Sequence, residues 1–366
     1  MKKVIGLVLT AVMAVSLAAC GGSGSSAAPA SSAAETEADS VAESAAESAA
    51  ETAGEAAEES AQAPEGEASG LKVALLLTGA ANDQGWNQSA YEGALKACEK
   101  YGCEFAYEEN IDAADIAASF ADYAGNGYDV VIGHSFSFGD PALEVAQTYP
   151  DTKFIITEGG VSAENVASYV MACEQTGYVE GIIAANMSQT GVIGAIGPIP
   201  GDSLVKIVNA YEDGAKSVNP DITVQKAWTN SYVDTQLAQE AAKAMIENNA
   251  DVIKHCANAC GNGAMAAAVE AGIWCQGDSY DQTSLAPDKI LDSALYNVDV
   301  VIDVALGSVI DGTFKGDVYN LGMADGAVEV LMSDNLPDDV KAIAQDAIDK
   351  ISSGELTVER DYTLRD

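Results

Sequence analysis

Short aliphatic runs alternate with amphipathic segments from Leu71 onward, and this alternation constrains the fold more than any other feature of the chain. In the first half the strand-like runs are residues 72–77, 104–108, 129–133, 153–156 and 167–170, separated by helical patterns over 87–101, 111–126 and 141–149. Buried aliphatic strands that alternate with helices are typical of a parallel sheet covered by helices on both faces.

The same rhythm begins again at residue 191. The second set of strand-like runs is 191–196, 223–228, 251–254 and 273–277, with helical patterns over 203–218, 235–248 and 261–271. We therefore predict an α/β fold of two doubly wound lobes, the first over residues 71–175 and the second over 176–290. Residues 291–366 are expected to cross back and complete both lobes. Because doubly wound sheets bind ligands at the carboxyl ends of their strands, we expect a ligand cleft between the lobes.

The N-terminal residues are typical of an export signal. A basic start precedes a short apolar run over residues 4–17, and Cys20 stands where cleavage is expected. This layout resembles a bacterial lipoprotein signal, and the run is shorter than the roughly 20 apolar residues that span a bilayer. We expect residues 1–19 to be removed and Cys20 to carry the lipid, palmitate included. The protein would then be anchored on the extracytoplasmic face of the cell membrane.

Residues 20–70 are predicted to form an acidic tether. They consist almost entirely of Ala, Ser, Glu and Gly, and residues 21–70 contain no Lys, Arg, aromatic residue, Ile or Leu. Such a segment cannot bury enough apolar surface to offset its ordering entropy, which favours disorder. A transient helix is the alternative, because Ala and Glu are good helix formers. In either case the segment is a spacer.

The net charge excludes one class of partner. The chain has 17 Lys and Arg against 56 Asp and Glu, a formal net charge of -39. Such a surface repels the phosphates of nucleic acids, so we expect no polynucleotide partner.

Cysteine usage leaves two alternatives open. Beyond Cys20 the chain has six cysteines, which an exported protein could pair as disulfides or keep as buried thiols; they are Cys98, Cys103, Cys173, Cys256, Cys260 and Cys275. His255, Cys256 and Cys260 lie close in sequence, but their spacing matches no strong zinc pattern. We expect no metal site and no cofactor.

Two sequence strings resemble a known family. Residues 82–93 read Asn-Asp-Gln-Gly-Trp-Asn-Gln-Ser-Ala-Tyr-Glu-Gly, and residues 277–282 read Gly-Asp-Ser-Tyr-Asp-Gln, close to the family pattern Gly-x-Asp-x-Asp-Gln. Both resemble the basic membrane protein family, the lipoproteins that bind purine nucleosides for ABC transporters. Further similarities extend the resemblance from about residue 71 to at least residue 333. It implies a type I periplasmic-binding-protein-like fold hinged around a cleft, a nucleoside-like ligand, and permease and ATPase partners.

The first string supplies three candidate ligand-binding residues. Trp86 is suited to stack on a flat ring, although it could also pack a loop. Asn87 offers both a donor and an acceptor to a purine edge, or caps the following helix. Asp83 and Asp278 follow strands in opposite lobes, where each carboxylate could accept from sugar hydroxyls or instead cap a turn or a helix.

Three aromatic residues complete the candidate set. Tyr232 lies where the resemblance places a second stacking aromatic, and Phe136 lies in an aromatic and hydroxyl-rich loop over residues 134–140. Tyr296 stands where relatives carry a lysine that contacts the sugar. These departures leave open a nucleobase, another nucleoside or a different polar metabolite.

Catalytic motifs are missing from the sequence. Ser135 lacks a Gly-x-Ser-x-Gly elbow, and residues 194–201 lack the Gly-Lys-Ser/Thr ending of a phosphate loop. We therefore expect a binding protein and not an enzyme. The alternatives are a ligand-sensing receptor domain for a membrane signalling partner and a nucleoside-processing enzyme.

Overall fold

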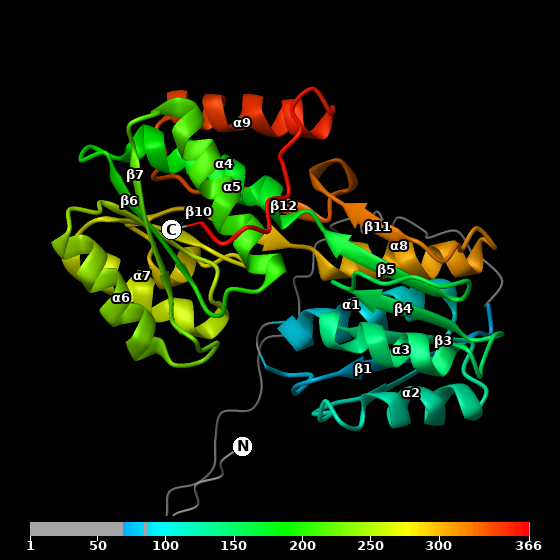
Figure 1. Ribbon diagram of the computed structural model, residues 1–366. Helices are drawn as coiled ribbons and strands as arrows, with labels where there is room; N and C mark the ends of the chain where they lie inside the picture. The colour runs from blue at the N-terminus through cyan, green and yellow to red at the C-terminus, as the bar shows by residue number, and fades with distance from the viewer. Residues whose placement is uncertain (1–68, 84–85, 366) are drawn as a thin grey trace, which may run out of the picture. The chain divides into compact units, whose positions relative to one another are not determined.

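The computed structural model describes residues 69–83 and 86–365, and these residues form two six-stranded sheets with helices on both faces (Figure 1). Cys20 and the predicted tether up to residue 68 lie outside the described residues. We call each sheet with its helices a lobe. The predicted α/β fold of two lobes is confirmed.

The sheet of the first lobe is entirely parallel, with the strand order β11-β5-β4-β3-β1-β2. Its strands are β1 (Lys72–Leu77), β2 (Glu104–Glu108), β3 (Val130–His134), β4 (Lys153–Thr157), β5 (Val166–Met171) and β11 (Val318–Leu321). Helices α1 (Trp86–Tyr101) and α8 (Val298–Ile310) pack together, and α2 (Ile116–Gly125) packs on α3 (Gly139–Ala146). The two helix pairs cover opposite faces of the sheet, which explains why the central strands are aliphatic throughout.

The sheet of the second lobe has the order β12-β10-β9-β8-β6-β7, and only the β10–β12 pair is antiparallel. Its strands are β6 (Val192–Gly197), β7 (Thr223–Trp228), β8 (Val252–His255), β9 (Trp274–Gly277), β10 (Ile290–Tyr296) and β12 (Val328–Met332). One face carries α4 (Cys173–Met187), α5 (Asp202–Val218) and α9 (Asp338–Ser352), and the other carries α6 (Thr235–Glu247) and α7 (Asn262–Ala271).

Helix α4 was not predicted from the hydrophobic pattern, because it is buried on nearly every side and shows no single apolar face. Glycines let it approach α5 closely. A Cβ at Gly181 would lie 2.0 Å from the Tyr211 carbonyl oxygen, and one at Gly214 would lie 2.0 Å from the Tyr178 carbonyl oxygen. The close contact of these two helices therefore depends on both glycines.

The chain passes between the lobes three times. It crosses after β5 into α4, after β10 into α8, and between β11 and β12 through a short 3₁₀ turn, Met323–Asp325. The last crossing separates β11 and β12, which belong to different sheets. The division falls at Gly322 and at Gly326, whose φ of 71° is readily adopted only by glycine.

Candidate functional site

Strained backbone marks the carboxyl ends of the strands. Seven described non-glycine residues have positive φ, and six of them lie within three residues after the end of a strand. They are Asn110, Ser135, Glu158, Asn230, Asn258 and Ser279. Such conformations cost about 1–3 kcal/mol each and concentrate at functional sites. The loops at this edge are therefore the place to look for a ligand site.

One pocket at this edge is built from both lobes. Its volume is about 270 Å³, and its lining combines aromatic and apolar side chains with side chains that can form hydrogen bonds. From the first lobe it is lined by Trp86, Gln88, Ser89 and Glu92 of α1 and by Val298 of α8; from the second by Ser279 and Tyr280 after β9 and by Tyr296 at the end of β10. Of the predicted site residues, Trp86 and Tyr296 line this pocket.

The indole of Trp86 rests on an imidazole. The ring centroids of Trp86 and His134 lie 4.2 Å apart with an interplanar angle of 28°. His134 Nε2 lies 3.0 Å from the Trp86 carbonyl oxygen, and His134 Nδ1 lies 2.7 Å from Thr157 Oγ1. Because a carbonyl can only accept, Nε2 carries the proton and Nδ1 accepts from the threonine hydroxyl. Burial lowers the pKa of His134 to about 3, so the ring beneath Trp86 is neutral near pH 7.

Asp83 and Asn87 hold the start of α1. The Asp83 carboxylate accepts from the Asn87 backbone N–H at 3.1 Å, from Asn87 Nδ2 at 2.8 Å and from the Gln88 backbone N–H at 3.0 Å. It therefore caps the helix, which was one of its two predicted roles. Asn87 Oδ1 accepts from the Gly79 backbone N–H at 3.3 Å, and the Asn87 side chain is buried. Both side chains thus fix the position of the adjacent Trp86.

Asp278 lies behind the second-lobe wall of the pocket and is hydrogen-bonded to two residues of that wall, Ser279 and Tyr296. Asp278 is only 4% exposed, and its carboxylate accepts from the Tyr296 hydroxyl at 2.9 Å and from Ser279 Oγ at 2.7 Å. Burial, followed by the nearby Asp278 carboxylate, raises the pKa of Tyr296 well above its usual value. The phenol therefore stays protonated and serves as a donor.

Buried amide and imidazole groups support the Asp278 loop from behind. Gln282 Oε1 accepts from the Asp278 backbone N–H at 3.0 Å and from His255 Nε2 at 2.9 Å. Compared position by position, Gly277, Asp281 and Gln282 match the family pattern, whereas Ser279 stands at its first aspartate.

Two predicted aromatic residues lie outside the pocket lining, and one unpredicted aromatic residue lies within it. Phe136 and Tyr232 are 68% and 42% exposed on loops after β3 and β7. Tyr280 is 41% exposed and lines the pocket. Its sequence signal is its place in the loop that follows the strand-like run 273–277.

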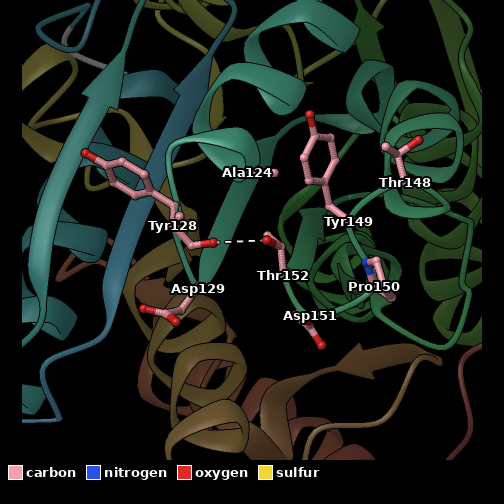
Figure 2. A pocket seen from close by; sticks show the side chains of 9 residues that line it. Ala124, Tyr128, Asp129, Thr148, Tyr149, Pro150, Asp151 and Thr152 are labelled. Carbon is pink, nitrogen blue, oxygen red and sulfur yellow. Dashed lines mark hydrogen bonds between the residues drawn. The ribbon is translucent and has the colours of Figure 1, made fainter.

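A second hollow lies at the opposite edge of the first sheet. Figure 2 shows it among residues that precede β3 and β4, with the Tyr128 carbonyl oxygen accepting from Thr152 Oγ1 at 3.0 Å. Its volume is about 280 Å³, and it contains none of the predicted site residues. Because it lies at the amino ends of the strands, the pocket beside Trp86 is the better candidate.

Metal and membrane criteria give two further findings for residues 69–83 and 86–365. No group of three or more His, Cys, Asp and Glu side chains in these ranges is arranged to hold a metal ion. None of the helices there combines the length and apolar character needed to cross a bilayer.

Two sequence relatives have names that state what they bind. A purine-binding protein of Brucella abortus (strain 2308) is 33% identical over 289 residues, covering 78% of this chain and 82% of that protein. The ABC transporter nucleoside-binding protein BmpA of Lactococcus lactis subsp. cremoris (strain MG1363) is 27% identical over 312 residues, covering 79% of this chain and 89% of BmpA.

A solved structure agrees with the fold. A solute-binding protein of an ABC transporter system from Aeropyrum pernix K1 superposes with a TM-score of 0.68 at 22% identity, covering 80% of this chain and 94% of that one. The predicted type I periplasmic-binding-protein-like fold is thereby confirmed. A sequence profile of the family described as "ABC transporter substrate-binding protein PnrA-like" matches residues 71–361. The chain therefore belongs to the PnrA-like family of ABC transporter substrate-binding proteins, which is the predicted basic membrane protein family.

Proposed function

We propose that this protein is a lipid-anchored receptor on the extracytoplasmic face of the membrane that captures a nucleoside-like ligand for an ABC permease and its ATPase. The observation that carries the proposal is the Trp86 indole, backed by neutral His134, in a pocket that also contains Tyr280 and Tyr296. A flat ring stacks on such an indole with a gain of about 1–3 kcal/mol. The names of the Brucella and Lactococcus relatives support the same ligand class.

The polar side of the pocket suits a sugar. Asp278 keeps acceptor capacity beyond the two hydroxyls that it already binds, because an ionised carboxylate has about four lone-pair sites. Gln88, Ser89 and Glu92 supply further donors and acceptors on the first-lobe wall. We infer that ribose hydroxyls lie between these two walls, with the base on Trp86.

For Phe136 and Tyr232 we propose a role other than stacking inside the pocket. Both are exposed aromatic residues on strand-end loops of opposite lobes. We propose that they cover the ligand when the lobes close, and that Asp83 and Asn87 act by holding Trp86.

We propose binding without catalysis. His134 and His255 are fully buried, and burial lowers the pKa of each. Their ring nitrogens are bonded to Trp86, Thr157, Gln282 and Ala257. Neither imidazole is therefore placed to exchange a proton with a ligand in the pocket.

The test is a thermal-shift and calorimetry screen of purine nucleosides, pyrimidine nucleosides, nucleobases, sugars and amino acids. A ligand at about 100 times its dissociation constant stabilises the native state by about 2.7 kcal/mol. We expect a nucleoside to shift the melting temperature of the wild type and to lose most of that shift in Trp86→Ala. A response to sugars or amino acids alone, unchanged in that variant, would contradict the proposal.

A further inference from the structure

We propose that Cys98 and Cys103 form a redox-responsive thiol pair that closes to a disulfide when the protein meets a small-molecule disulfide. This pair joins the end of α1 to the start of β2, at the opposite end of α1 from Trp86. The proposal is independent of the ligand and concerns a site outside the pocket.

The backbone brings the two cysteines together through the end of α1. The Cys103 N–H donates to the Cys98 carbonyl oxygen at 2.9 Å, the Gly102 N–H donates to the Glu99 carbonyl oxygen at 3.4 Å, and Gly102 has a φ of 65°. These are the paired hydrogen bonds of a Schellman motif, which frequently brings together the side chains at the two positions held by Cys98 and Cys103, and here the Cys103 thiol is a hydrogen-bond partner of the Cys98 thiol. The helix ending itself thus places one thiol beside the other.

The two thiols differ in access. Cys98 is 2% exposed and packs into the core between α1 and the sheet, whereas Cys103 is partly exposed. Ser69 Oγ lies 3.3 Å from Cys103 Sγ, and the Ser69 and Gly70 N–H groups donate to the Tyr101 and Gly102 carbonyl oxygens. The pair therefore lies beside Ser69 and Gly70, the first residues that the structure describes.

The remaining cysteines in the described ranges are placed differently. Cys260 donates to the Asp234 carbonyl oxygen at 2.9 Å, and Cys275 donates to the Lys289 carbonyl oxygen at 3.5 Å. Cys173 and Cys256 are buried among carboxylate and ammonium groups. Only Cys98 has another thiol, that of Cys103, among the groups that perturb it.

The chemistry runs in two balanced steps. The Cys103 thiolate attacks an external disulfide R–S–S–R, forming Cys103–S–S–R and releasing one R–SH. The Cys98 thiolate then attacks the Cys103 sulfur, forming the Cys98–Cys103 bond and releasing the second R–SH. Two protein thiols are oxidised and one external disulfide is reduced to two thiols, so atoms and electrons balance.

Burial, and next the Cys103 thiol, raises the pKa of Cys98 to about 12. Because only the thiolate attacks, the second step is slow at neutral pH. Its rate should rise about tenfold for each pH unit between 7 and 9, as the thiolate fraction does.

The experiment treats the purified full chain with oxidised glutathione, blocks residual thiols under denaturing conditions, and maps tryptic peptides. Trypsin cleaves after Lys96 and Lys100, so Cys98 leaves in peptide 97–100 and Cys103 in peptide 101–153. We expect these two peptides to be recovered joined, with the loss of two hydrogens, and to separate on reduction. Cys103→Ser should release peptide 97–100 with a blocked thiol, and Cys275→Ser should leave the joined pair unchanged.

Two results would overturn the proposal. One is a stable glutathione adduct on Cys103 with Cys98 still a thiol at pH 9, because this means that Cys98 cannot reach its partner. The other is recovery of both cysteines as blocked thiols from a natively folded protein that has been fully exposed to the oxidant.

Discussion

The Trp86 ring has one face against His134, so a ligand ring can use only the face that borders the pocket. We predict that Trp86→Ala weakens ligand binding by about 1–3 kcal/mol, roughly five- to a hundredfold or more, with a small loss of stability. Calorimetric titration and thermal unfolding of the same variant measure the two effects. Tyr280→Ala should weaken binding in the same range, since Tyr280 lines the same pocket.

The matched control is Trp274→Ala, because Trp274 begins β9 at the opposite end of the strand from Asp278 and packs into the core. It should lower the melting temperature and leave affinity unchanged. Unchanged affinity in Trp86→Ala, together with a large fall in melting temperature, would remove Trp86 from the site and reduce the case for a nucleoside.

Tyr296 donates the phenolic proton that helps satisfy a buried carboxylate. We predict that Tyr296→Phe destabilises the protein by about 1–3 kcal/mol, because one oxygen of the largely buried Asp278 carboxylate then loses its donor. Chemical denaturation measures the change. Tyr319→Phe is the control, since that hydroxyl makes only a 3.3 Å exposed contact to the Lys315 carbonyl oxygen. Equal losses of stability in the two variants would mean that the Tyr296–Asp278 hydrogen bond stabilises the protein no more than the exposed Tyr319 contact does.

At the scale of single residues, the sequence indicates which side chains suit a ligand site better than it indicates which partners those side chains contact. It selected Trp86 as a stacking aromatic and Tyr296 at the position of a sugar-contacting lysine in relatives, and both line the pocket. It offered two roles for Asp83, and the choice of helix cap depended on hydrogen bonds that only coordinates reveal. Tyr280 was missed because its direction depends on the left-handed backbone at Ser279, which no residue pattern indicates.

At the scale of elements, the strands were predicted most accurately because their aliphatic runs are short, continuous and bounded by turn residues. Boundaries were less accurate where polar turns precede a helix. The helix predicted from residue 111 begins at Ile116, because the N–H of Asp115 bonds the Asp112 carbonyl oxygen in a turn. Strand β11 pairs with β5 and strand β12 pairs with β10. These pairings were not predictable from the local sequence, because they depend on strands that are distant in the chain.

Helix α4 and strand β10 bring two carboxyl groups into the core of the second lobe. Glu180 Oε1 and Asp292 Oδ1 each lack a hydrogen-bond donor, while Lys254 and Gln276 bond the other two oxygens. Burial raises the pKa of Asp292 to about 7 and also raises that of Glu180. An amide at position 292 could accept from Gln276 and donate to the free Glu180 oxygen.

We therefore predict that Asp292→Asn stabilises the protein at pH 8 and that the gain is smaller at pH 5. The native state holds the Asp292 proton above the unfolded-state pKa of 3.8, so the stability contributed by this group falls as pH rises from about 4 to 7. Asparagine does not titrate, so the difference between the two proteins should grow over that window by at most about 1.4 kcal/mol per pH unit. Urea unfolding at several pH values measures it.

The control for this charge change is Asp251→Asn, whose carboxylate accepts from Ser188 Oγ and from the Gln189 and Thr190 N–H groups. This variant should be less stable than the wild type at pH 8. A loss of stability at pH 8 in Asp292→Asn as well would show that the ionised Asp292 is required in the folded protein.

At the scale of the whole molecule, the predicted lipid anchor and the candidate pocket lie in different parts of the chain. The family match covers residues 71–361, and every residue that lines the pocket lies between Trp86 and Val298. The predicted lipid site, Cys20, precedes both, with the acidic segment between them. We therefore predict that Cys20→Ala releases the protein from the membrane and leaves ligand affinity unchanged. Fractionation of cells that express the variant, followed by titration of the released protein, tests both halves. Continued retention in the membrane would mean that residues 4–17 act as an uncleaved anchor, and weakened affinity would mean that the N-terminal segment contributes to the site.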